Sequence, residues 1–206
     1  MQTSPSTLVF DIGNVLIGWD PRNLYRKLLP ERSDEMEWFL AHVCTGEWNL
    51  ELDRGRDFAA AIRELIARQP PRLHGLIRAY HERWIEMLSG EIAGSVGILE
   101  RLHAAGVPLY AITNWNHETF QLARAAYACL ERFRGIVVSG EERVLKPDPT
   151  IYRILCERYQ LRPERCLFID DSVKNVRGAE AFGMRGLTFE SPEQLEQDLK
   201  SLGVLS

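Results

Sequence analysis

Carboxylates follow two short apolar segments of this chain. Asp11 comes directly after residues 8–10, and the pair Asp170 and Asp171 comes directly after residues 167–169. Short apolar runs of this kind predict buried strands, and open α/β sheets gather their ligands at the carboxyl ends of the strands. A carboxylate in such a position can attack an electrophile or bind a divalent cation. We therefore take Asp11 as the candidate nucleophile.

A hydroxyl, an amide and a lysine occupy similar positions after two other apolar segments. Thr113 and Asn114 follow residues 109–112, and Lys146 comes after residues 135–138. Phosphoryl transfer spreads negative charge over the phosphoryl oxygens, so the protein mainly supplies positioned hydrogen-bond donors and cations. The four segments together predict a site for a metal ion and a phosphoryl group.

The segments that carry these residues alternate with helical patterns from residue 95 onward. Strand-like segments are expected at residues 107–112, 135–138, 166–169 and 185–189, and helical segments at 95–106, 117–128, 149–159, 173–182 and 192–202. Repeated strand–helix units predict an α/β fold, with a Rossmann-like parallel sheet and helices on both faces.

The chain between the first two expected strands is too long for a simple crossover. Residues 34–43, 56–68 and 73–88 each carry apolar side chains at three- and four-residue spacing, which predicts helices. We expect an all-helical cap at residues 18–90, inserted after strand 1, and a Rossmann-like catalytic core formed by residues 1–17 and 91–206. A helical block beside a strand end is well placed to act as a lid.

The bulk properties argue against several classes of function. The 206 residues carry a formal net charge of −4 and no block of Lys or Arg, so we expect no nucleic-acid partner. No apolar run approaches the roughly 20 residues that span a bilayer, so we expect no membrane partner. The four cysteines form no CxxC pair and the N-terminal residues show no signal-peptide pattern, which predicts a cytoplasmic protein.

The ordered motifs resemble those of the haloacid dehalogenase-like hydrolases, in the branch with a helical cap after the first strand. The matching segments are Phe10-Asp11-Ile12-Gly13-Asn14-Val15, Ile112-Thr113-Asn114, Leu145-Lys146-Pro147-Asp148-Pro149, and Phe168-Ile169-Asp170-Asp171-Ser172 with Asn175. Each motif alone is weak, but their order at four strand ends is specific. The resemblance implies catalytic roles for Asp11, Thr113 and Lys146.

The same resemblance implies a magnesium site. Asp11, the backbone carbonyl of Gly13 and Asp171 are expected to hold Mg²⁺, which prefers oxygen ligands and keeps several waters. Asp170 and Asn175 are expected not to touch the metal themselves but to orient its waters or Lys146.

One position departs from the family pattern. Most phosphatases of this family have a second Asp two residues after the nucleophile, where this chain has Gly13. A glycine still offers its backbone carbonyl as a metal ligand, but it has no carboxyl group to act as general acid and base. Such a group typically raises the reaction rate by about 10²–10⁴-fold. Branches with this Gly-Asn-Val sequence resemble sugar-phosphate phosphatases, and an anomeric phosphate would need less acid help. Asp20 is one candidate substitute; the alternative is that it caps a helix beginning at Pro21.

The expected cap contains the best candidates for substrate selectivity. Residues 45–56 combine aromatic, acidic and cationic side chains around a glycine, and Trp48 and Arg54 are taken as substrate-binding residues together with Asn114. Core packing of Trp48 and simple surface exposure of Arg54 remain open alternatives. Residues 115–116 could also line the pocket.

These observations favour a Mg²⁺-dependent phosphomonoester hydrolase that acts through an aspartyl-phosphate intermediate. The expected partner is a small phosphorylated metabolite, with a sugar phosphate as one candidate, and the expected assembly is a monomer or homodimer.

Two other functions stay open. A 2-haloacid dehalogenase would use Asp11 to attack carbon without a metal, and dehalogenases of the family also lack the second Asp. They usually carry serine or asparagine where this chain has Asp170 and Asp171. A phospho-acceptor or sugar-phosphate-binding protein without turnover is the third possibility.

Overall fold

A parallel β-sheet forms the centre of the molecule. The structure is a computed structural model that describes residues 5–205. Within that range the sheet has the strand order β5-β4-β1-β6-β7, and every neighbouring pair is parallel. The strands are β1 (Thr7–Phe10), β4 (Leu109–Thr113), β5 (Gly135–Val138), β6 (Cys166–Asp170) and β7 (Arg185–Thr188). The order places β1 in the middle, between the strands that carry the other site residues.

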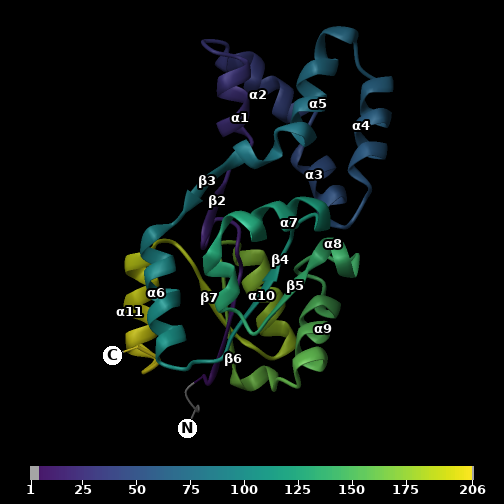
Figure 1. The fold of residues 1–206 in the computed structure, drawn as a ribbon. Helices are drawn as coiled ribbons and strands as arrows, with labels where there is room; N and C mark the ends of the chain where they lie inside the picture. Colours follow the sequence, from purple (N-terminus) through teal and green to yellow (C-terminus); the bar gives the residue numbers. More distant parts are fainter. Residues whose placement is uncertain (1–4, 206) are drawn as a thin grey trace.

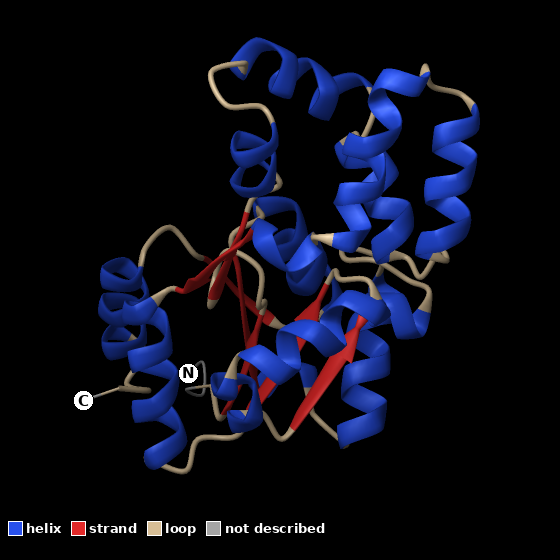
Figure 2. Ribbon diagram, turned by 45° about the horizontal axis from the view of Figure 1, so that its top comes forward, coloured by secondary structure: helices blue, strands red, loops and turns tan. Residues whose placement is uncertain are grey.

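Helices cover both faces of this sheet (Figure 1, Figure 2). Alternate strand residues point to opposite faces, so Leu8 and Phe10 join one apolar core while Val9 joins the other. The first core also contains side chains of α6 (Ala93–Ala104), α7 (His117–Ala126) and α11 (Pro192–Ser201). The second contains side chains of α9 (Pro149–Tyr159) and α10 (Val173–Phe182). The expected α/β fold with a doubly covered parallel sheet is confirmed.

Shorter helices complete the connections between these strands. They are α8 (Ser139–Glu142), η3 (Ala128–Arg132) and η4 (Pro163–Arg165). The α8 turn directly follows β5, so it lies at the carboxyl edge of the sheet, where the polar side chains gather.

A group of helices lies beyond this edge of the sheet (Figure 1). They are α1 (Arg22–Leu28), α2 (Ser33–His42), α3 (Gly46–Asp53), α4 (Phe58–Ala67) and α5 (His74–Glu82), with the 3₁₀ helices η1 (Pro71–Leu73) and η2 (Trp84–Met87). Two short antiparallel strands, β2 (Ile17–Trp19) and β3 (Leu88–Glu91), connect this helical segment to the sheet. The expected boundaries at 17/18 and 90/91 fall inside these strands.

The structure differs from the expected helix at residues 73–88. Helix α5 ends at Glu82, and the chain continues as η2 and then β3. The break lets Trp84 and Met87 turn into the core, where they are 4 % and 0 % exposed, while β3 pairs with β2. Three- and four-residue apolar spacing continues through such a break, so it does not reveal where the helix stops.

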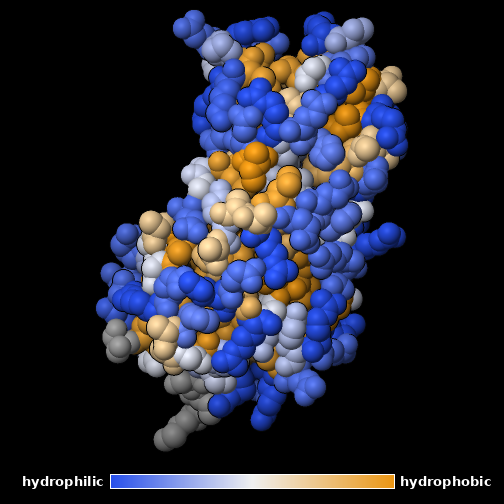
Figure 3. All heavy atoms as spheres, viewed as in Figure 1, coloured by the Kyte–Doolittle hydropathy of each residue, from blue (hydrophilic) through white to orange (hydrophobic). Residues whose placement is uncertain are grey.

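Figure 3 shows a mostly hydrophilic surface, with apolar side chains gathered where the helical segment meets the sheet. Among the described residues, none of the helices combines the length and the apolar character needed to cross a membrane.

Candidate active site

The loop after β1 brings Asp11 to the carboxyl edge of the sheet and then reverses direction. Asn14 has a φ of 56°, a left-handed conformation that asparagine tolerates better than most residues. Its backbone N–H donates to the carbonyl of Ile17 at 2.8 Å, and its side-chain Oδ1 accepts from the N–H of Trp19 at 2.8 Å. The turn therefore leads the chain directly into β2 and leaves Asp11 and Gly13 facing a cavity.

Lys146 joins two carboxylates at the centre of the site. Its ammonium nitrogen lies 2.8 Å from Oδ1 of Asp11 and 2.6 Å from Oδ2 of Asp170. All three residues are buried, with Lys146 only 4 % exposed. Burial lowers the pKa of Lys146, but the two carboxylates outweigh it and raise the pKa, so the side chain stays cationic. Burial raises the pKa of Asp11, and the ammonium of Lys146 opposes that rise.

Asp170 is fixed on every side by hydrogen bonds. Its Oδ1 accepts from the backbone N–H of Ser172 at 2.8 Å, and its two oxygens accept from Nδ2 of Asn175 at 3.1 and 3.2 Å. Asn114 holds the other side of the lysine loop, accepting from the Lys146 N–H at 2.8 Å and donating to its carbonyl at 3.2 Å. These bonds position the ammonium group of Lys146 between Asp11 and Asp170.

The acidic residues are close enough to share a cation. Asp11, Asp170 and Asp171 each offer a carboxylate oxygen, and these oxygens lie within 4.8 Å of one another. Both oxygens of Asp170 accept hydrogen bonds, whereas the bonds to Asp11 reach only its Oδ1. Oδ2 of Asp11 and the carboxylate of Asp171 are therefore available, and Gly13 lines the same cavity. An all-oxygen donor set of this kind fits Mg²⁺.

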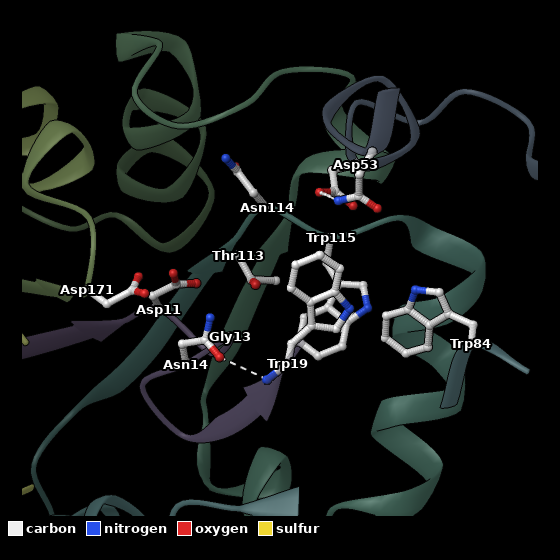
Figure 4. Close-up of a pocket in the computed structure, with 11 residues that line it drawn as sticks. Asp11, Gly13, Asn14, Trp19, Asp53, Trp84, Thr113, Asn114, Trp115 and Asp171 are labelled. Atoms are coloured by element: carbon white, nitrogen blue, oxygen red, sulfur yellow. Dashed lines mark hydrogen bonds between the residues drawn. The ribbon is translucent and has the colours of Figure 1, made fainter. Parts of the chain in front are cut away.

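Asp11, Gly13 and Asp171 face a cavity of about 150 Å³ beneath the helical segment (Figure 4). Its lining consists of Asp11, Gly13, Asn14, Trp19, Asn49, Asp53, Trp84, Thr113, Asn114, Trp115 and Asp171. The sheet edge supplies the nucleophile candidate, the hydroxyl of Thr113 and the carboxylate of Asp171. The helical segment and its connecting strands supply aromatic rings, an amide and a further carboxylate.

Three residues considered from the sequence lie elsewhere. The ring of Trp48 packs edge-on against Tyr80, with centroids 5.0 Å apart, and is not part of the cavity lining. Arg54 lines a neighbouring hollow together with Lys146 and Asn175. The carboxylate of Asp20 accepts from the backbone N–H of Arg22 at 2.9 Å, at the start of α1, and does not line the cavity.

Selectivity was expected in residues 45–56, with Trp48 and Arg54 singled out, whereas Asn49 and Asp53 line the cavity. These two residues lie one helical turn apart on α3. Nδ2 of Asn49 donates to Oδ2 of Asp53 at 2.8 Å, and Oδ1 of Asn49 accepts from the hydroxyl of Tyr80 at 2.8 Å. Burial raises the pKa of Asp53 to about 8, although hydrogen bonds from Asn116 and Asn49 act in the opposite direction. The spacing of four residues was visible in the sequence, but it does not say which face of α3 meets the cavity.

The C-terminal end of α3 is held against the sheet edge. The side chain of Asn116 donates to the carbonyl of Leu52 at 2.8 Å, and the hydroxyl of Ser139 donates to the carbonyl of Asp53 at 2.6 Å. Gly55 has a φ of +94°, and a β-carbon there would overlap the carbonyl oxygen of Gly140. Only glycine permits both this conformation and this close approach.

Comparisons with known proteins identify the family. The model of the haloacid dehalogenase-like hydrolases matches residues 5–183, so the chain belongs to this family of hydrolases.

Named relatives include enzymes of two kinds. The chain is 32 % identical over 136 residues to (S)-2-haloacid dehalogenase 1 of Pseudomonas sp. (strain CBS-3), covering 66 % of this chain and 56 % of that enzyme. It is 26 % identical over 187 residues to the sesquiterpene phosphatase astK of Aspergillus oryzae, covering 91 % of both chains.

Solved structures show the same fold. A magnesium complex of the family enzyme bt-2542 from Bacteroides thetaiotaomicron aligns with a TM-score of 0.72 at 20 % identity, over 96 % of this chain and 100 % of that one. The same enzyme has also been solved with magnesium and inorganic phosphate.

Proposed function

We propose that this protein is a Mg²⁺-dependent phosphomonoester hydrolase that acts on a small phosphorylated metabolite through an aspartyl-phosphate intermediate. The observation that carries the proposal is the geometry around Asp11. Its carboxylate forms an ion pair with the buried ammonium group of Lys146 and faces a cavity. The carboxylate of Asp171 lies close enough to share a cation with it.

The residues present can perform the steps of phosphoryl transfer. An oxygen of Asp11 attacks phosphorus, and Lys146 supplies a fixed positive charge for the phosphoryl oxygens. Thr113 presents its hydroxyl to the same cavity as a hydrogen-bond donor. Mg²⁺ held by Asp11, the Gly13 carbonyl and Asp171 would neutralise phosphate charge and lower the pKa of Asp11.

The cavity composition suggests a neutral leaving group with hydroxyls. Among the described lining residues there is no Lys or Arg, so nothing there favours a second phosphate on the leaving group. The rings of Trp19, Trp84 and Trp115 offer flat apolar surfaces, and Asn49 offers an amide. Trp115 lines the cavity, and its buried indole N–H has no hydrogen-bond partner within residues 5–205. A sugar monophosphate meets these requirements.

The dehalogenase relative makes 2-haloacid hydrolysis the second candidate. In that reaction Asp11 would attack carbon and release a halide. The available carboxylate of Asp171 argues against it, because a metal-free reaction on a small carboxylate substrate gains nothing from another negative charge beside the nucleophile.

A substrate screen separates the two candidates. Purified protein is assayed for phosphate release from a panel of sugar and polyol monophosphates, with Mg²⁺ and with EDTA, and for chloride release from 2-chloropropionate. We expect Mg²⁺-dependent phosphate release that Asp11→Asn abolishes. Chloride release without Mg²⁺, and no phosphate release from any member of the panel, would overturn the proposal.

A further inference from the structure

The proposed reaction needs a proton donor that the first motif does not provide. When the bond from phosphorus to the leaving oxygen breaks, an alkoxide forms unless an acid protonates it. Position 13 faces the cavity but is a glycine, and a β-carbon placed there would meet nothing within 4 Å. The space for an acidic side chain exists on the sheet side of the site, but no side chain fills it.

A carboxyl group faces the same cavity from the opposite side. Figure 4 shows Asp53, at the end of α3, across the cavity from Asp11 and Asp171. Asp53 is not part of the carboxylate cluster that fits a cation. Of the acids that line the cavity, it is therefore the one that neither attacks phosphorus nor faces the metal position.

The surroundings hold Asp53 in place and keep it protonated. Its carboxylate accepts from Asn49 at 2.8 Å, and its backbone carbonyl accepts from Ser139 at 2.6 Å. Burial raises its pKa to about 8, and the negative charge of Asp11 adds to this rise. The other titratable group that faces it, Tyr80 on α5, has a pKa raised well above its ordinary value by burial, so it stays neutral. Near neutral pH Asp53 therefore carries a proton that it can donate.

We propose that Asp53, contributed by the helical segment, is the general acid and base that replaces the missing aspartate at position 13. The inference rests on the proposed phosphatase function. In the first step an Asp11 oxygen bonds to phosphorus, the bond to the leaving oxygen breaks, and the Asp53 proton moves to that oxygen to give the alcohol. In the second step water attacks phosphorus and gives its proton to the Asp53 carboxylate, while the bond to Asp11 breaks and phosphate leaves.

The direct test compares leaving groups in wild type and Asp53→Asn. An alkyl or sugar monophosphate has a basic leaving oxygen that needs a proton, whereas p-nitrophenyl phosphate does not. We expect kcat/KM to fall by about 10²-fold or more for the alkyl ester and by less than about tenfold for the aryl ester. Glu51→Gln is the matched control, because it removes an exposed carboxylate from the same helix and should leave both values unchanged. Equal losses on the two esters would overturn the acid role.

Two further measurements do not depend on that ratio. In wild type, kcat/KM for the alkyl ester should decline above about pH 8, where Asp53 loses its proton, and Asp53→Asn should lack this decline. With p-nitrophenyl phosphate, Asp53→Asn should release a burst of nitrophenol and then slow, because the base for the second step is absent. The same alkaline decline in both proteins, or no burst, counts against the inference.

A rescue experiment tests the replacement directly. In the double variant Gly13→Asp/Asp53→Asn, we expect at least a tenfold recovery of alkyl-ester turnover over Asp53→Asn, because position 13 has room for the side chain. If Asp53→Asn does not fold, the wild-type pH dependence on the two esters still decides the question. Turnover that survives in Asp11→Asn would defeat the proposed function itself. Turnover that is lost in Asp11→Asn but unchanged in Asp53→Asn would contradict this inference and leave the proposed function standing.

Discussion

Lys146 is a positive charge enclosed by protein, and its two carboxylate partners leave it no contact with bulk water. A buried ion pair gains little net stability when complete, because both charges lose their hydration. Removing one partner is different, since the remaining charge is then buried without compensation. The arrangement is therefore better explained by the need to hold an ammonium group next to Asp11 than by stability of the fold.

The first prediction concerns this residue. Lys146→Met keeps an unbranched side chain out to the ε-carbon but leaves Asp11 and Asp170 facing each other without a cation. We expect a loss of about 3–5 kcal/mol in the free energy of unfolding, measured by urea denaturation, and loss of turnover. Lys174→Met, an exposed lysine on α10, is the control and should change stability by less than about 0.5 kcal/mol. A Lys146→Met protein as stable as the control would contradict the buried triad.

At this scale the sequence allowed part of the site to be predicted. Asp11, Thr113 and Asp171 follow strands that can be recognised locally, so their meeting at one edge follows from the parallel sheet. Asp53 could not be found in this way. Which side of α3 faces the cavity depends on how Trp48 packs against Tyr80, a contact between residues 32 positions apart.

The strands differ in how well they can be predicted from the sequence. Strands β1, β4, β5 and β6 are mostly apolar runs, because both faces of the sheet are covered, whereas the edge strand β7 contains Arg185 and Gly186. All five strands were predicted to within about two residues. Strands β2 and β3 are three and four residues long and contain Gly18 and Gly90, so they lack both the length and the alternation that identify a strand. They form only because the fold brings two segments that are far apart in the sequence side by side.

The second prediction concerns the contact between α3 and the sheet edge. Gly55→Ala places a β-carbon against the carbonyl oxygen of Gly140 and also disfavours the left-handed backbone. Gly90 has a similar φ of +99° but open space around it, so Gly90→Ala isolates the backbone effect, about 1–2 kcal/mol. We expect Gly55→Ala to lose a further 1–3 kcal/mol or so in thermal or urea unfolding, and to lower turnover as α3 shifts. Equal losses of stability in Gly55→Ala and Gly90→Ala would show that the contact between Gly55 and Gly140 can accommodate a β-carbon.

For the whole molecule, the fold class follows from the alternation of strand and helix patterns, and the structure agrees. The long stretch before the second central strand was recognisable as helical, but α3 and the end of α5 at Glu82 were not predicted. One apolar core, running from the sheet into the helical segment, contains both Phe10 and Tyr25, so the two parts share buried surface. Sharing of this kind depends on contacts across the chain that no local pattern reports.

The third prediction uses ligand binding to the folded protein. Mg²⁺ and inorganic phosphate, each alone and then together, are added while thermal unfolding is followed. Ligands present at about 100 times their dissociation constant stabilise the folded state by roughly 2.7 kcal/mol, which corresponds to about 5–10 °C for a chain of this size. We expect the combined ligands to give this shift in wild type and in the exposed control Asp34→Asn, and Asp171→Asn to lose it. A shift of equal size in Asp171→Asn would exclude that residue as a ligand of the cation.

The chain enters and leaves the helical segment at almost the same point. The N–H of Ile92 donates to the carbonyl of Leu16 at 2.8 Å, and β2 and β3 run side by side from there. Everything between these two residues could be exchanged for a different segment in one recombination event without moving a strand of the sheet. A descendant of this gene could therefore keep Asp11, Lys146 and Asp171 and acquire a new substrate selectivity, provided that the incoming segment supplied an acid in place of Asp53.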